Sequence, residues 1–228
     1  MSQLDEIRMQ VMWNRLISVV EEQAMTLLRT AFSTSVREAG DLSAGVYNAQ
    51  GEMLAQAVTG TPGHVNTMAE AVLHFIAEIP REDMYPGDTY VTNDPWKGTG
   101  HLHDITMVSP SFNGEELIGF FACTAHVVDV GGRGFGADGK SVYEEGIQIP
   151  IMKFAKHGEV NKDLLRILRP HALRELHAFR PGIERHVEMV LPGQAVPRSI
   201  LQHGAHHAAQ RVLGQDIVTD VVDGHGWR

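Results

Sequence analysis

Residues 117–125 form an almost uninterrupted apolar run, which constrains the fold more than any other part of the sequence. A half-exposed strand would alternate polar and apolar residues, so this run predicts a β-strand that is buried on both faces. Residues 105–109 also have strand character, and Asn113 and Gly114 mark a turn between the two segments. The rest of the chain must therefore supply the surfaces that cover this strand.

The other patterns predict helices and further strands. Residues 2–32 carry apolar side chains at helical spacing and predict one long amphipathic helix that packs on the protein. Helices and strands follow each other without a βαβ repeat, so we predict an α+β fold: a long N-terminal helix followed by a mixed sheet with interspersed helices and loops. The remaining predicted elements are a hairpin of strands 42–47 and 53–57, a helix at 64–77 and a short strand at 89–92.

Composition narrows the setting in which the protein works. The net charge of −9 argues against a nucleic-acid partner, which would usually meet a basic face. The single cysteine, Cys123, excludes an internal disulfide and favours a reducing compartment, and its apolar surroundings predict a core residue rather than a nucleophile. We find no signal-peptide pattern and no apolar run near the roughly 20 residues of a membrane span. A cytoplasmic protein without a membrane partner is expected.

The densest polar cluster lies in residues 93–104, a loop with glycine and proline between two predicted strands. His101 and Asp104 are three residues apart there, and imidazole with carboxylate suits a divalent metal ion. His126 is the best candidate for a third ligand, because it ends the apolar run before a glycine turn. Two histidines and one carboxylate leave coordination positions open, which is typical of a catalytic rather than a structural metal site.

Spacing alone leaves alternatives to this metal site. The loop could be solvated, with its side chains capping backbone groups. His126 could be a hydrogen-bonded core histidine. His103 is a rival ligand to His101, because side chains two residues apart in an extended segment point the same way. The glycine-rich segment 131–136 lacks both the GxGxxG and the P-loop pattern and is interpreted as a backbone bend.

Several segments, in their order and spacing, resemble the hydantoinase B/oxoprolinase family from about residue 5 to about residue 168. This family includes hydantoinase B subunits, the matching half of 5-oxoprolinase, and the large subunits of acetone and acetophenone carboxylases. The segments are FSTSVRE at 32–38, GHVNTM at 63–68, PGD at 86–88, NDP at 93–95, GHLHDI at 100–105, AHVVDVGG at 125–132 and YEEGIQIP at 143–150.

The resemblance also implies a ligand set. In the carboxylase branch a divalent metal is held by a histidine, an aspartate three residues on and a later histidine, which match His101, Asp104 and His126. Many relatives carry proline at the position of His103, which ranks it below His101. The ion itself would be manganese, zinc or iron.

Three further residues are candidates for the pocket. Asp129 is a candidate to orient the third ligand or to act as a general base. His64 is a weaker catalytic candidate, and Glu145 is a weaker candidate for a place in the pocket. A structural role is the favoured alternative for both.

A partner is implied as well: a hydantoinase A-type subunit that binds ATP and activates the substrate by phosphorylation. We therefore predict the B-type subunit of an ATP-dependent cyclic amidase, which opens a hydantoin-like or 5-oxoproline-like ring with the help of a metal inside a hetero-oligomer. One alternative is the large subunit of a ketone carboxylase. Another is an inactive remnant that only binds a partner subunit.

The composition changes near Arg169. All five lysines precede it, whereas seven of the 13 histidines follow it, together with four prolines. We expect residues 1–168 to form the family-like region and 169–228 a divergent tail, interpreted as a truncated or frame-shifted reading. The alternative is a short homologue with a C-terminal segment of its own.

Overall fold

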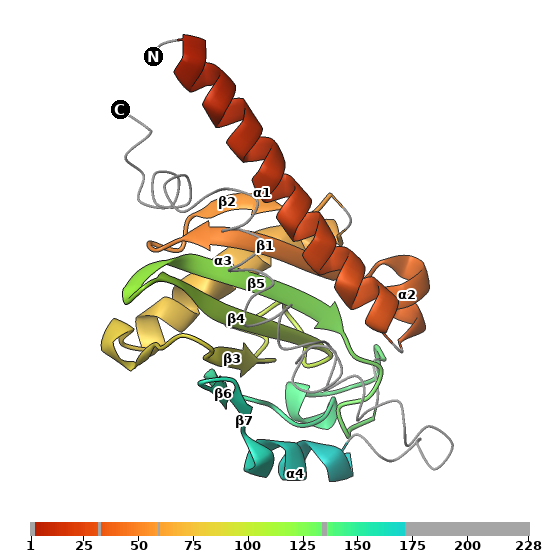
Figure 1. Cartoon of the computed structure of the whole chain (residues 1–228). Helices are drawn as coiled ribbons and strands as arrows, with labels where there is room; N and C mark the ends of the chain where they lie inside the picture. Colours follow the sequence, from red (N-terminus) through yellow and green to blue (C-terminus); the bar gives the residue numbers. More distant parts are fainter. Residues whose placement is uncertain (1–2, 32, 59, 134–135, 172–228) are drawn as a thin grey trace.

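The computed structural model describes residues 3–31, 33–58, 60–133 and 136–171, and these build one antiparallel sheet with helices on both faces (Figure 1). Within this part of the chain the sheet has seven strands in the order β2-β1-β5-β4-β3-β6-β7. The strands are β1 Leu42–Asn48, β2 Met53–Gln56, β3 Thr89–Thr92, β4 Asp104–Asn113, β5 Glu116–His126, β6 Met152–Lys156 and β7 Glu159–Val160. The helices are α1 Gln3–Thr30, α2 Thr34–Ala39, α3 Pro62–Glu78 and α4 Lys162–His171, with short 3-10 helices η1 Arg81–Asp83 and η2 Val142–Glu144.

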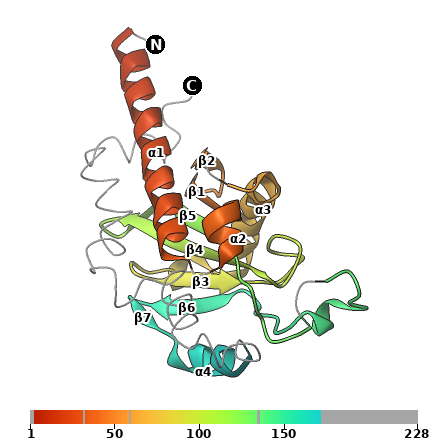
Figure 2. The ribbon, with the colours of Figure 1, turned by 90° about the vertical axis from the view of Figure 1, so that its right-hand side faces the viewer.

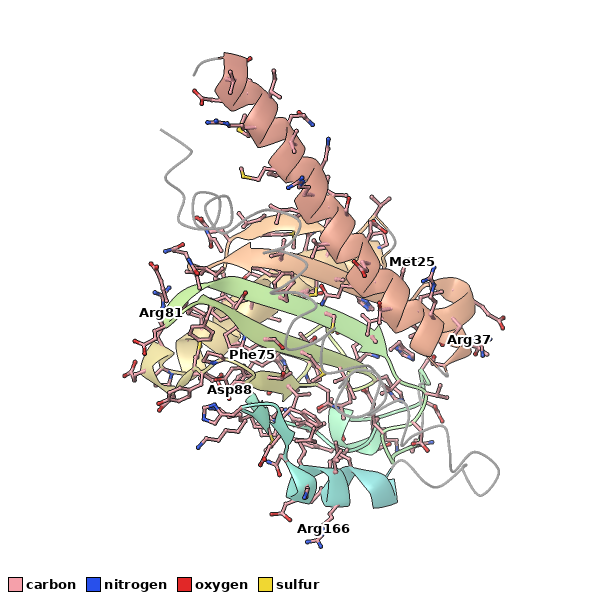
Figure 3. All side chains as sticks on the ribbon, viewed as in Figure 1. Met25, Arg37, Phe75, Arg81, Asp88 and Arg166 are labelled. Atoms are coloured by element: carbon pink, nitrogen blue, oxygen red, sulfur yellow. The ribbon has the colours of Figure 1, made fainter. Side chains whose placement is uncertain are left out.

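Strand β5 lies inside the sheet, between β1 and β4, and both of its faces are covered. Phe121 and Cys123 belong to the core cluster that includes the buried residues of α1. Phe120 and Ala122 belong to a second cluster, which includes Phe75 and other residues of α3 (Figure 3). Figure 2 shows α1 and α3 on opposite sides of the sheet. The predicted strand with two buried faces is confirmed, and its alternate residues serve two separate cores.

Helix α1 has a packed part and a projecting part. From Leu16 onward its apolar residues pack on β1 and β2, and Val20 and Ala24 are fully buried. Toward the N-terminus the helix extends past the sheet and exposes Leu4 and Ile7 (Figure 1). The predicted N-terminal helix is confirmed, although only its C-terminal half contributes to the core.

The α+β class, the hairpin of β1 and β2, and the helix α3 agree with the predictions, and every described strand pair is antiparallel. Helices α2 and α4 and strands β6 and β7 were not predicted from the sequence. Helix α4 runs across residue 168, where the divergent tail was expected to begin, and residues 172–228 of that tail lie outside the described part.

None of the described helices combines the length and apolar character that a membrane crossing requires.

Candidate metal centre

The polar cluster of the sequence lies at one end of the sheet, where β4 begins and β5 ends. Asp104 is the first residue of β4 and pairs directly with His126, the last residue of β5. Strand β1 begins beside them, and the backbone N–H of His126 donates to the carbonyl of Asp41, 3.1 Å away. The loop after β3 delivers His101 to the same place. Three strand ends and one loop therefore bring these side chains together.

Asp104 is the centre of the cluster, and its side chain is fully buried. Its Oδ2 accepts hydrogen bonds from His101 Nε2 at 2.7 Å, from Thr99 Oγ1 at 2.7 Å and from His64 Nε2 at 2.9 Å. Its Oδ1 lies 3.0 Å from His126 Nδ1. A carboxylate can only accept, so each ring nitrogen facing Asp104 carries a proton in this arrangement.

Contacts within the cluster shift the pKa values of Asp104, His101 and His103. Burial alone would raise the pKa of Asp104, but hydrogen bonds from His101, His126 and His64 outweigh burial and hold that pKa well below its usual range. The hydrogen bond to Asp104 raises the pKa of His101. Burial lowers the pKa of His103, and the neighbouring His126 and His101 lower it further. A negative carboxylate thus organises the imidazoles, as a cation-binding site requires.

Asp41 also lies in the cluster, although it was not among the residues predicted from the sequence. Its Oδ2 lies 3.7 Å from His126 Nδ1, and its Oδ1 lies 3.6 Å from His64 Nε2. Thr61 Oγ1 donates to Oδ1 of Asp41 at 2.8 Å. The signal that could have found it is the one used for His126, a polar residue at the end of an apolar strand.

The chain reaches Asp41 through a helix end. Ser33 is the N-cap of α2, and its side chain accepts a hydrogen bond from the N–H of Val36. Gly40 is the C-cap and lies in the left-handed region with φ 68°. Glycine adopts that conformation at little cost, and the turn lets the N–H of Asp41 bond back to the carbonyl of Ser35. The segment that carried part of the family resemblance therefore builds the approach to the site.

His64 lies in the first turn of α3 and is buried. Its Nε2 contacts both Asp104 and Asp41, whereas its Nδ1 is buried without a hydrogen-bond partner among the described residues. The structure therefore places this predicted residue inside the cluster, where it links two carboxylates.

The other candidates surround this centre. The ring of His103 is fully buried, with its centroid 5.6 Å from that of His126 and 6.0 Å from that of His101. Glu145 accepts the N–H of Leu102 and thereby touches the loop between the two histidines.

Asp129 follows β5 in a turn of its own. Its Oδ1 accepts the N–H of Gly131 at 2.7 Å, and its Oδ2 is buried with no hydrogen-bond partner in the described part of the chain. Asp104 and Asp41 are two carboxylates that contact His126, whereas Asp129 accepts its hydrogen bond from its own turn.

The donor set fits a divalent ion. One ligand atom each from His101, Asp104 and His126 lies within 4.8 Å of the others. Ligands of a first-row metal lie about 2.0–2.2 Å from the ion, so donors around it are roughly 3–4.5 Å apart, and only a small closure is needed. Metal binding would replace the protons on the two ring nitrogens, and Asp41 offers a further carboxylate beside them.

Comparison with known sequences gives a family match along most of the chain. The family described as Hydantoinase B/oxoprolinase matches residues 5–193. A 5-oxoprolinase of Pestalotiopsis fici is 34% identical over 167 residues, which cover 72% of this chain and 13% of that protein. A putative B-type subunit of a D-/L-hydantoinase from a Pseudomonas species is 26% identical over 211 residues, covering 83% of this chain and 35% of that protein. The chain thus spans only a minor part of these curated relatives.

Solved structures share the fold. The nucleotide-free structure of acetone carboxylase superimposes with a TM-score of 0.71 at 22% identity, over 95% of this chain and 27% of that one. The ATP-dependent caprolactamase of Pseudomonas jessenii superimposes with a TM-score of 0.74 at 23% identity, over 98% of this chain and 37% of that one. At these identities the likeness is one of fold.

Proposed function

The chain belongs to the hydantoinase B/oxoprolinase family, and from this premise we propose that it is the B-type part of an ATP-dependent enzyme that opens cyclic amides with the help of a divalent metal. The observation that carries the proposal is the convergence of three imidazoles on the buried carboxylate of Asp104. The names of the 5-oxoprolinase and hydantoinase relatives support the substrate class.

We assign the metal ligands to His101, Asp104 and His126, with manganese, zinc or iron as the ion. When bound, such an ion supplies a Lewis acid that polarises a carbonyl and makes a nearby water more acidic. Two histidines and one carboxylate leave room for substrate in the coordination sphere. Asp41 and His64 keep these ligands in place through their contacts with His126 and Asp104.

The remaining chemistry requires a proton acceptor. We assign this role to Asp129, because Gly131 fixes one of its oxygens and the other has no hydrogen-bond partner in the described part of the chain. In the proposed reaction a partner subunit of the hydantoinase A type transfers a phosphoryl group from ATP to the amide oxygen of a hydantoin-like or 5-oxoproline-like ring. Water then adds to that carbon, and Asp129 accepts a proton from it and returns that proton to the ring nitrogen. The ring C–N bond breaks to give an amine and an acyl phosphate, and a second water hydrolyses the acyl phosphate to a carboxylate and inorganic phosphate.

The structure of acetone carboxylase supports a second candidate, the large subunit of a ketone carboxylase. In that reaction the activated substrate would combine with bicarbonate-derived carbon dioxide rather than with water. Product formation that requires bicarbonate would favour the carboxylase, whereas ring opening in its absence would favour the amidase. A chain that catalyses neither reaction, although it binds an A-type partner, would be the inactive remnant.

The test is the metal content of the purified chain, measured by mass spectrometry, followed by an assay with an A-type subunit, ATP and each substrate. We expect near-stoichiometric metal in the wild type and its loss in His101→Ala. His74→Ala is the matched control, because His74 lies on α3 about 15 Å further along the helix than His64. Metal that is absent from the wild type, or equally present in His101→Ala, would overturn the assignment.

A further inference from the structure

The backbone of Leu102 is held at both of its polar groups by side chains from other parts of the chain. Its carbonyl accepts a hydrogen bond from Asn93 Nδ2 at 2.8 Å, and its N–H donates to Glu145 Oε2 at 3.2 Å. The side chain of Leu102 is fully buried and packs on Val127 and Val130. The residue between His101 and His103 therefore has little freedom to move.

Both the nitrogen and the oxygen of the Asn93 side-chain amide form hydrogen bonds here. Besides the bond to Leu102, its Nδ2 donates to the carbonyl of Ile147 at 3.0 Å, and its Oδ1 accepts the N–H of Ile149 at 2.6 Å. The side chain is 1% exposed. One amide thus joins the end of β3, the loop that carries His101 and the segment that leads into β6. No other common side chain of this size offers two donors and one acceptor in this geometry.

The segment that carries Glu145 is itself fixed to the turn after β5. Gly131 and Gly146 form an isolated β-bridge, and the N–H of Ile147 donates to the carbonyl of Val130 at 2.8 Å. The two backbones are so close that a Cβ at Gly132 would lie 2.2 Å from the carbonyl carbon of Glu145. The same loop is therefore joined both to the residues after His126 and to the loop that carries His101.

We propose that Asn93 and Glu145 are positioning residues, which clamp Leu102 and so hold His101 in place beside Asp104. This inference rests on the proposed metal centre, since the clamp acts on one of its ligands. Groups that orient a metal ligand typically change metal affinity by 10–100-fold when they are removed. Neither residue is proposed to touch the metal or the substrate.

The first test titrates the full-length chain with Zn²⁺ alone and follows the Kd by calorimetry. Asn93→Ala and Glu145→Ala should each raise the Kd about tenfold or more, whereas Glu145→Gln, which keeps an oxygen acceptor, should stay within about threefold of the wild type. Asn48→Ala is the matched control. Asn48 is also a buried asparagine with three side-chain hydrogen bonds, but it lies at the other end of β1, about 20 Å from Leu42.

A second readout, without metal, tests the clamp itself. Deuterium uptake at residues 100–104 should rise in Asn93→Ala and Glu145→Ala but not in Asn48→Ala. A folded Asn93→Ala with wild-type Kd and wild-type uptake would overturn the inference. A wild type that binds no Zn²⁺ would overturn the metal centre instead. The uptake measurement would then decide alone: increased uptake in the variants would support the clamp, and unchanged uptake would reject it.

Discussion

Asp104 and His126 are direct partners in the β4–β5 pair, and their side chains meet at 3.0 Å between Oδ1 and Nδ1. Directly opposed residues of an antiparallel pair have their Cβ atoms about 4.5–5.5 Å apart, which suits this contact. A slip of one residue would move the side chain of His126 to the opposite face. The register that places Phe120 and Phe121 on two separate cores therefore also builds the candidate metal centre.

Asp104→Asn should show how much the cluster depends on the negative charge of Asp104, because the substitution removes that charge and keeps the size of the side chain. The amide keeps the size of the side chain but replaces a carboxylate that accepts four hydrogen bonds from side chains. Hydrogen bonds to a charged group contribute about 1.5–3 kcal/mol, so we expect the free energy of unfolding in urea to fall by about that amount. Metal content, measured by mass spectrometry, should be lost.

The matched control for this change is Asp88→Asn. The side chain of Asp88 is also fully buried and accepts a hydrogen bond from Lys153 at 2.7 Å, but it precedes β3, whereas His101 lies in the loop beyond the other end of that strand. A similar loss of stability with full metal content is expected. If the two variants retained the same amount of metal, the role of Asp104 as a ligand would be rejected.

His101→Ala and His103→Ala should differ in metal affinity although the two residues are neighbours. Nε2 of His101 contacts Asp104 at 2.7 Å, while His103 stacks behind the cluster with a pKa lowered by burial and by two histidines. We expect Zn²⁺ binding to be lost in His101→Ala and to stay within about tenfold of the wild type in His103→Ala, as for a group outside the ligand set. The opposite order in a calorimetric titration would make His103 the ligand.

The parts of the fold that the sequence could predict are those with a strong local pattern. The almost uninterrupted apolar run of β5 predicted that both faces of this strand are buried, and the helical spacing of apolar residues predicted α1. By contrast, β7 has two residues and α2 has six, which is too short for any period to appear. Strand β7 is defined by its pairing with the neighbouring β6, and α2 by its caps at Ser33 and Gly40.

The residues of the candidate site also differ in how well the sequence predicts them. His101 and Asp104 are close in sequence and carry a recognisable spacing, whereas the contacts of Asp41 depend on β1 lying beside β5. No local pattern encodes that neighbour relationship, because strand order is set by the packing of the whole sheet. The hydrogen bonds of Asn93 to Leu102, Ile147 and Ile149 also join segments up to 56 residues apart. The NDP segment at 93–95 is part of the family resemblance, but no local pattern predicts these partners of Asn93.

Two leucines of α1 should differ sharply in their contribution to stability. Leu16 is 4% exposed and lies in the core cluster, whereas Leu4 is 61% exposed on the projecting part of the helix. Leu16→Ala should lower the free energy of unfolding by about 2–5 kcal/mol. Leu4→Ala, the control in the same helix, should change it by no more than about 0.5 kcal/mol. Equal losses in urea denaturation would mean that the projecting half is packed in solution.

Cys123 should be inert in the folded protein. Burial raises the pKa of its thiol from 9.0 to about 12. Because the thiolate is the reactive form, its fraction at pH 8 falls roughly 10³-fold, and burial blocks access as well. An Ellman assay should therefore register almost no thiol in buffer and one thiol per chain in denaturant. Rapid labelling of the native chain would contradict the packing of β5 between its two cores.

Asp129→Asn tests the proposed proton acceptor apart from metal binding. The amide oxygen can still accept the N–H of Gly131, so the turn should persist, but the side chain can no longer take a proton at neutral pH. With an A-type subunit and ATP, we expect kcat for ring opening to fall about 10²–10⁴-fold while metal content is unchanged. Asp138→Asn is the control, since Asp138 lies nine residues further along on the surface and pairs with Arg133. If Asp129→Asn lost its metal, the carboxylate of Asp129 would be needed to hold the metal ligands rather than to accept a proton. Asp41 and His64, which also contact the cluster, would then be the candidates for the general base.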